Sequence, residues 1–222
     1  KLFAVLLPLC LSLLSLSLSL SFLPDSTPPD PKTLTAMGVM ASNPCVAPRQ
    51  ASVVCCGLDN AGKSTILSHL IEDLPSVIHP TAGMALQHFV KYGVEWRVWD
   101  CSGTGASRGM WPLFYPHASG VVFVVDASDR DRISCAKDEL EALLLHPDFR
   151  KRHFSLLLLL NKMDLDSENT MSAVEIETIL RLKHLQLSQR NVDLHVQSCS
   201  AIKGTGIEEG FRWLGDSMNS SG

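Results

Sequence analysis

Residues 57–64 read Gly-Leu-Asp-Asn-Ala-Gly-Lys-Ser, directly after a short apolar run and before a helical period. In this context the pattern is typical of a loop that binds nucleotide phosphates. The glycines let the backbone curl so that successive N–H groups face a β-phosphate, and the start of the following helix adds partial positive charge. Lys63 would then bridge the β- and γ-phosphates, while the Ser64 hydroxyl would bind Mg²⁺. The segment therefore predicts a site for a nucleoside triphosphate and magnesium.

A second polar motif indicates which base is bound. Residues 161–164 read Asn-Lys-Met-Asp and follow a run of five leucines, where the open edge of an α/β sheet places ligand contacts. The Asp164 carboxylate can accept hydrogen bonds from both N1–H and the 2-amino group of guanine, and adenine offers neither donor. Sites built on such bonds reject the wrong ligand by roughly 10⁴-fold. Ser200 and Ala201 follow the last predicted strand, where the Ala201 N–H would face guanine O6. GTP or GDP is the predicted ligand.

The elements that position these motifs are predicted from the alternation of short aliphatic runs with helical periods, which begins at Ala51. This alternation indicates an α/β fold, a mostly parallel sheet with helices on both faces. We predict six strands, at Ser52–Cys56, Ala85–Lys91, Val94–Trp99, Val121–Val125, Phe154–Leu160 and Asp193–Gln197. We predict four helices, at Lys63–Leu74, Ile133–Leu145, Ser172–Leu182 and Ile207–Met218, because apolar residues recur there at three- and four-residue spacing.

Composition excludes other classes of protein. The chain has 222 residues, enough for one ordinary domain and a tail. Its net charge of −4 offers no broad basic face, so we do not expect it to bind nucleic acid. The seven cysteines form no Cys-x-x-Cys pair and the eight histidines show no ligand spacing, so we assign no metal to them. We expect a monomer.

Residues 1–36 form an apolar and proline-rich leader. The Leu-Ser alternation at residues 16–21 is what a CTCTCT repeat encodes, so misread untranslated message, a signal peptide and a membrane anchor stay open as three interpretations. Prolines and small polar residues continue to residue 50 and predict disorder. Residues 37–50 begin Met-Gly-Val-Met-Ala-Ser, which makes Gly38 a myristoylation site if Met37 is the true start. The folded domain is assigned to 51–219.

Four motifs together resemble the ADP-ribosylation-factor-like branch of small GTPases: Gly57-Leu58-Asp59-Asn60-Ala61-Gly62-Lys63, Pro80-Thr81-x-Gly83, Trp99-Asp100-x-x-Gly103 and Asn161-Lys162-Met163-Asp164. The resemblance covers about Ala51 to Met218 and is greatest to the ciliary branch that recruits the BBSome coat. It implies a P-loop NTPase fold with a six-stranded sheet. It also implies a guanine-nucleotide site made of Gly57, Asp59, Asn60, Ala61, Gly62, Lys63, Ser64, Thr65, Thr81, Gly103, Asn161, Lys162, Asp164, Ser200 and Ala201.

By the same resemblance, two loops would respond to the γ-phosphate. Thr81 would join Ser64 as a ligand of Mg²⁺, and Gly103 would donate its N–H to the γ-phosphate. Loss of that phosphate would release both loops, and the hairpin between them would shift register. The family presents an apolar effector patch where this chain has Met84, Trp99 and Phe114, although core packing is an equally good interpretation of these three residues.

Thr104 follows Gly103, where the family carries the glutamine that orients the attacking water. Of the catalytic residues that the resemblance implies, Lys63 and Gly103 are present, whereas threonine is too short to replace glutamine. Even Ras with its glutamine hydrolyses GTP at only about 10⁻⁴ s⁻¹ unaided. We therefore expect very slow hydrolysis. Pro112 lies in the predicted second switch helix, which should be short or irregular.

The leading hypothesis is a GTP-dependent switch in intracellular trafficking, with an exchange factor, a GTPase-activating protein and coat or adaptor effectors as partners. It would be cytoplasmic and peripheral on membranes, at the base of the cilium if the resemblance extends that far. One alternative is a non-hydrolysing GTP-binding scaffold, which Thr104 favours. The other is a membrane-anchored receptor subunit similar to the signal-recognition-particle receptor β chain, which requires the leader to be a real span.

Overall fold

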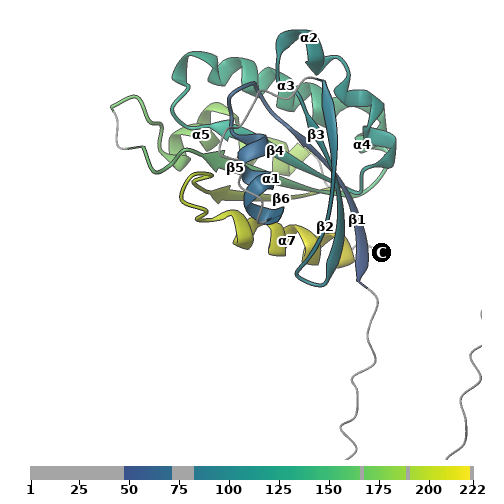
Figure 1. The fold of residues 1–222 in the computed structure, drawn as a ribbon. Coiled ribbons are helices and arrows are strands. Elements are labelled where there is room, and N and C mark those ends of the chain that lie inside the picture. The colour runs from purple at the N-terminus through teal and green to yellow at the C-terminus, as the bar shows by residue number, and fades with distance from the viewer. Residues whose placement is uncertain (1–47, 72–82, 166–167, 189–190, 221–222) are drawn as a thin grey trace, which may run out of the picture. The chain divides into compact units, whose positions relative to one another are not determined.

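The computed structural model describes residues 48–71, 83–165, 168–188 and 191–220. Its strands are β1 (Arg49–Cys56), β2 (Met84–Lys91), β3 (Val94–Cys101), β4 (Gly120–Asp126), β5 (Phe154–Asn161) and β6 (Val192–Ser198). They form one sheet in the order β2-β3-β1-β4-β5-β6 (Figure 1). Only β2 and β3 are antiparallel, and the other neighbouring pairs are parallel. The predicted six-stranded, mostly parallel sheet is confirmed.

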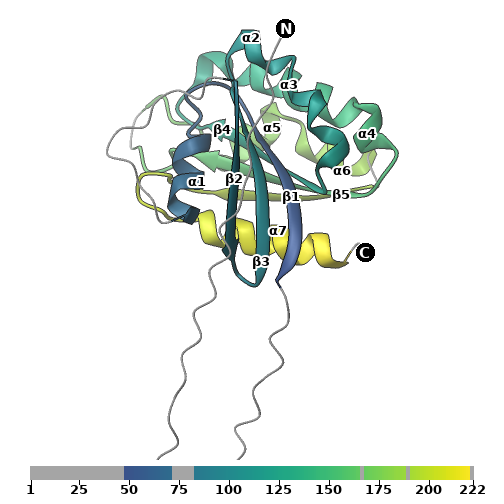
Figure 2. The ribbon, with the colours of Figure 1, turned by 45° about the vertical axis from the view of Figure 1, so that its right-hand side comes forward.

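Helices cover both faces of the sheet, as the fold class requires. Helices α1 (Lys63–Ile71) and α7 (Ile207–Ser220) pack on one face, where Ile66 and Phe211 are fully buried against strand side chains. The opposite face carries α3 (Ile133–Leu145), α4 (Pro147–Arg150), α5 (Ala173–Ile179) and α6 (Leu182–Ser188). Figure 2 shows the two groups on either side of the strands. Strands β4 and β5 are buried on both faces, which explains their continuous apolar runs.

The helix predicted at 172–182 is wrong in its last three residues. It ends at Ile179, Arg181 takes a left-handed backbone with φ of 53°, and α6 then begins at Leu182. The reason is burial: Leu180 and Leu182 are both in the core. Two residues that are two positions apart point to different sides of one continuous helix, so the chain must bend between them. The apolar spacing continues across residues 180–182, so the sequence prediction did not recognise α6 as a separate helix.

The other predicted helices agree more closely with the structure. Helix α1 begins at Lys63 as predicted and is described as far as Ile71, and residues 72–74 of the prediction lie outside the described residues. The second switch helix is short, as Pro112 predicts: α2 spans Gly105–Arg108 and is followed by two 3₁₀ turns, each with a proline near its start. Among the described residues, no helix combines the length and apolar character needed to cross a bilayer.

Candidate functional site

The phosphate loop joins the end of β1 to the start of α1, as the sequence predicts. It needs glycine at both ends, since Gly57 has φ of 134° and Gly62 has φ of 93°, and a Cβ on Gly62 would lie 2.2 Å from Asn161 Nδ2. The Lys63 side chain is only 6% exposed. Its Nζ donates to the Gly57 carbonyl at 3.1 Å and the Leu58 carbonyl at 2.8 Å. The ammonium group therefore points into the loop, where a phosphate would meet it.

The oxygen groups beside the loop suit magnesium. Ser64 Oγ donates to Asp100 Oδ2 at 2.6 Å, and Asp100, on β3, is 2% exposed. A hydroxyl and a buried carboxylate at the phosphate loop are hard oxygen donors, the ligands that Mg²⁺ prefers. The residues present therefore fit the ion. The sequence prediction named Ser64 and missed Asp100, although the Trp99-Asp100-x-x-Gly103 motif contains it. Thr81 lies outside the described residues.

Asn161 connects the phosphate loop to the predicted guanine loops. Its Nδ2 donates to the Ala61 carbonyl at 2.8 Å, and its Oδ1 accepts the Ala201 N–H at 2.8 Å. Asn161 is 1% exposed and Ala201 is 4% exposed, so both bonds are shielded from water. One amide thereby fixes the spacing between the loop that follows β1 and the loop that follows β6.

The next two motif residues have different surroundings. Lys162 adopts a left-handed backbone with φ of 65°, and its Nζ lies 2.6 Å from Asp126 Oδ2 at the end of β4. Strained backbone of this kind is often found at binding sites. A hydrogen bond from Ser200, helped by the charge of Lys203, holds the pKa of Asp164 below its usual value against a smaller effect of burial. Asp164 is therefore ionised at neutral pH and is purely an acceptor, as guanine recognition requires.

Gly103 lies against the phosphate loop. A Cβ at this position would come within 2.2 Å of the Leu58 carbonyl carbon and 2.3 Å of the Asp59 nitrogen, so only glycine fits. The next residue, Thr104, is exposed at the start of α2, and its hydroxyl donates to Ser107 Oγ at 2.9 Å. The position after Gly103 thus faces solvent and carries a side chain that is hydrogen-bonded within α2.

Arg108 joins the segment after Gly103 to α3, and Arg132, which directly precedes α3, contacts the phosphate loop. Arg108 Nε donates to the Gly103 carbonyl at 2.8 Å, and Nη1 donates to Glu139 of α3 at 3.0 Å. Arg132 Nη1 donates to Asp59 Oδ1 at 3.0 Å. Although partial burial opposes it, the Arg132 bond and charge keep the pKa of Asp59 below its usual value. The sequence analysis assigned no role to Arg132 or Glu139, because their partners are distant in the chain.

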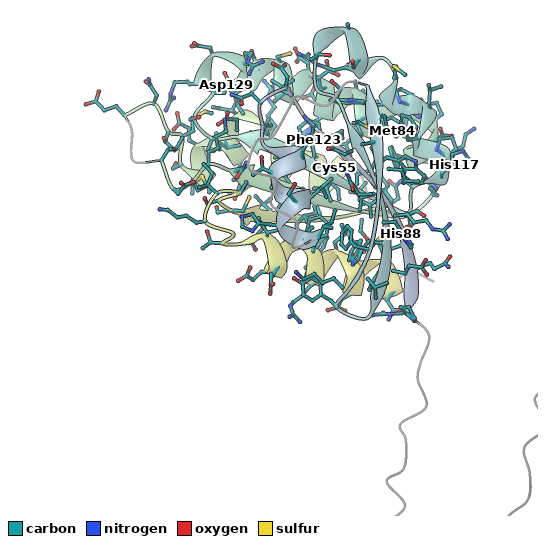
Figure 3. The ribbon with its side chains drawn as sticks, in the orientation of Figure 1. Cys55, Met84, His88, His117, Phe123 and Asp129 are labelled. Carbon is teal, nitrogen blue, oxygen red and sulfur yellow. The ribbon has the colours of Figure 1, made fainter. Side chains whose placement is uncertain are left out.

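Of the predicted effector residues, Met84 and Trp99 lie on β2 and β3, and Phe114 lies between the two 3₁₀ turns that follow α2. The rings of Trp99 and Phe114 are stacked with centroids 6.3 Å apart. The centroid of the His117 ring lies 6.5 Å from that of Trp99. Met84, at the start of β2, is 39% exposed, and the neighbouring Leu86, which pairs with Trp99, is 57% exposed. Figure 3 shows Met84 and His88 on β2 and His117 beyond the strands. Trp99 and Phe114 are only partly buried, so part of this apolar area is exposed. Gly38, the predicted lipidation site, lies outside the described residues.

Known proteins match most of the chain. The model of the ADP-ribosylation factor family matches residues 38–218. ADP-ribosylation factor-like protein 6 of Danio rerio is 36% identical over 172 residues, 77% of this chain and 89% of that protein. ADP-ribosylation factor-like protein 5 of Dictyostelium discoideum is 34% identical over 169 residues, 76% and 88% of the two chains.

Among solved structures, the Arl6 BBS3 small GTPase from Trypanosoma brucei with bound nucleotide analogue GppNp has a TM-score of 0.70 and 33% identity. The match covers 78% of this chain and 99% of that one. The residues matched by the family model include the phosphate loop, Gly103 and both loops on the guanine side.

Proposed function

Because the chain belongs to the ADP-ribosylation factor family of small GTPases, we propose that it is a GTP-dependent switch that recruits effectors or coats in intracellular membrane trafficking. The observation that best supports the proposal is the Asn161 bridge, which holds a phosphate loop and a guanine-reading loop at a fixed spacing. A binding site for GTP and GDP needs both loops at once.

In this proposal different groups of the described residues bind the phosphates, the guanine base and the magnesium ion. The backbone of the loop from Gly57 to Gly62 and the Lys63 ammonium hold the phosphates, since N–H groups at a helix start favour anions. Asp164 would read guanine. The Ala201 N–H, which we propose binds guanine O6, donates to Asn161 Oδ1 at 2.8 Å here, so it would exchange that partner for O6 when the nucleotide binds. Mg²⁺, held by Ser64 and aided by Asp100, would neutralise phosphate charge when bound.

The switch is proposed to work through Gly103. Its backbone lies against the phosphate loop, and its carbonyl accepts a bond from Arg108, which is itself tied to α3. A γ-phosphate contact at the Gly103 N–H would therefore change the position of α2 and of the neighbouring Phe114. A partner that binds the Trp99–Phe114 area would sense the nucleotide in this way.

Hydrolysis is proposed to be slow. Members of this family are GTPases, but Thr104 offers a short hydroxyl that is already bonded to Ser107, where the family's glutamine would orient water. The GTP-loaded state would then persist until a partner supplies the missing group. The same observation favours a second candidate function, a GTP-binding scaffold that does not hydrolyse GTP at all. An assay of whether a partner stimulates GTP hydrolysis distinguishes the switch from the non-hydrolysing scaffold.

The finer parts of the proposal rest on likeness to named relatives. The 36% identity to ADP-ribosylation factor-like protein 6 and the match to the Arl6 BBS3 GTPase support a ciliary role in which a coat is recruited. Peripheral membrane attachment would come from a myristoyl group on Gly38. One such chain binds membranes only marginally, so a second signal would be needed.

The test is to identify the nucleotide bound to purified protein by chromatography, and then to compare proteins captured by the GTP-analogue-loaded and GDP-loaded forms. We expect guanine nucleotide and a capture pattern that depends on its state. The matched control is Asp164→Asn, which replaces one of the two carboxylate acceptors for guanine with an NH₂ donor and should lose GDP while staying folded. Purified protein without nucleotide, and without saturable binding of a fluorescent GTP analogue in millimolar Mg²⁺, would refute the proposal.

A further inference from the structure

A cavity of about 550 Å³ lies between α3, α4 and α6, away from the nucleotide site. Figure 2 shows these three helices close together on the face of the sheet opposite α7. A volume of 300–1,000 Å³ is usual for cavities that bind small molecules or a few residues of a peptide. The cavity is therefore large enough to hold a ligand of its own.

The position of the cavity separates it from the switch. It lies where β5 and β6 begin, near Arg150 and Leu185, whereas the nucleotide loops follow the carboxyl ends of the same strands. A strand of seven or eight residues separates the two ends by roughly 20 Å. A ligand in the cavity would touch neither the phosphate loop nor the Trp99–Phe114 area.

The base of the cavity is apolar. Leu144 and Leu185 line it and also pack into the hydrophobic core beneath, together with Leu140 and Leu182. At the edge, Leu145 is 59% exposed. An aliphatic side chain of a ligand would find apolar contacts here at no cost to the core, because the base is already formed.

Two arginines and one carboxylate carry the charge of the walls. Arg150 and Arg181 line the cavity together with the His184 ring and with Glu141, whose carboxylate lies 3.9 Å from Lys137 Nζ. Neither Arg150 nor Arg181 has an ion-pair partner among the residues that the structure describes. Two guanidinium groups on the walls of a concave site are suited to carboxylates, which arginine binds through paired N–H donors. The whole chain is acidic, with a net charge of −4, so the excess of arginine in this cavity differs from the average charge of the protein.

The backbone at Arg181 supports a binding role. This residue has φ of 53° at the joint between α5 and α6, a position where glycine is the usual residue. An arginine there costs conformational energy that glycine would not. Its side chain lines the cavity and has no ion-pair partner among the described residues, so its charge is available to a ligand.

We propose that this cavity is a docking site for an acidic peptide segment of a partner protein, with glutamate or aspartate side chains on Arg150 and Arg181 and one aliphatic side chain on Leu144 and Leu185. The concave shape fits side chains rather than the flat surface of a bilayer. Because the site is remote from Gly103 and the phosphate loop, the partner binds equally to the GDP and GTP forms. The inference goes beyond the proposed switch and does not depend on it.

The test is an NMR titration of the full-length, GDP-loaded protein with a blocked pentapeptide that has a central leucine, flanking glutamates and terminal glycines. We expect saturable shifts confined to amides around the cavity, and the same shifts with a GTP analogue bound. A peptide with glutamines in place of both glutamates should bind about tenfold more weakly, and the variants Arg150→Glu and Arg181→Gly should each bind the glutamate peptide several-fold more weakly. Arg181→Gly suits the backbone at this joint, so loss of binding there would not reflect unfolding.

The matched control is Lys151→Glu, which reverses an exposed charge beside the cavity but not in its wall. It should leave peptide affinity within twofold of the unaltered protein. Equal binding of the glutamine peptide would overturn the proposal, as would the absence of saturable shifts at the cavity. If inorganic phosphate alone reproduced the shifts and displaced the peptide, the site would be one for small anions, and the peptide proposal would be wrong.

Discussion

Replacing Asn161 with alanine should damage both folding and nucleotide binding. The asparagine joins two loops whose bonded groups, the Ala61 carbonyl and the Ala201 N–H, are 100 and 40 residues away in the chain. Alanine removes both hydrogen bonds and leaves the two backbone groups buried, since Ala61 and Ala201 are 1% and 4% exposed. The small space left by the side chain is lined by Gly62, which has no side chain to fill it.

The size of the effect follows from these contacts. A buried polar group without a partner costs about 1–3 kcal/mol, so two such groups predict a loss of about 3 kcal/mol in the free energy of unfolding, with water entry keeping it near the low end. Nucleotide affinity should also fall. The loops that hold phosphate and guanine lose their fixed spacing, and we expect GDP to dissociate at least about tenfold faster, equivalent to about 1.4 kcal/mol.

The assay measures urea unfolding at several GDP concentrations, because stabilisation by a ligand grows with its concentration and extrapolation separates folding from binding. Dissociation of a fluorescent GDP analogue is measured in parallel. The control is Asn191→Ala, which removes two comparable hydrogen bonds, to the Phe149 and Arg152 carbonyls at 2.6 and 2.8 Å. Asn191 precedes β6, at the opposite end of the strands from the nucleotide loops.

We expect Asn191→Ala to lower stability while leaving GDP dissociation unchanged. The reasoning fails if the two variants lose equal stability and release GDP at equal rates. It also fails if Asn161→Ala is destabilised but binds GDP as tightly as the unaltered protein, since the Asn161 bridge would then contribute to folding only.

Three further outcomes are expected. Thr104→Gln should raise the rate of single-turnover GTP hydrolysis about tenfold or more, since it restores a side chain that can orient water; a starting rate already equal to that of glutamine-bearing relatives would contradict this. Gly103→Ala should weaken capture of GTP-state partners roughly tenfold, because its Cβ meets backbone at 2.2 Å, whereas Gly105→Ala, which meets nothing within 4 Å, should be silent. Burial raises the pKa of Tyr92 to about 12. Its neutral form is thus favoured by folding, and this stabilisation is present below pH 10 and lost as pH rises towards 12. Thermal melts of Tyr92→Phe should therefore decline less between pH 9 and 12 than those of the unaltered protein.

The fold could be predicted in detail where local pattern and tertiary packing agree. Strands β4 and β5 are continuous apolar runs because both of their faces are covered, and the sequence shows this directly. At Arg181 the local sequence pattern and the tertiary packing disagree. The helical period continues through it, but the core needs Leu180 and Leu182 on the same side, so the chain breaks there.

The sequence alone determined the chemistry of the loops, because the phosphate loop and the Asn-Lys-x-Asp motif depend on residues that are neighbours in the chain. The backbone curl and the helix start are set within residues 57–64, and the carboxylate acceptor is set within residues 161–164. Only the tertiary structure decided which side chains join those loops: Asn161 to Ala61 and Ala201, Arg108 to Glu139, and Arg150 to the same cavity as Arg181. These partners lie tens of residues apart, and the packing of helices on the sheet brings them within hydrogen-bonding distance or into one cavity, which no local spacing encodes.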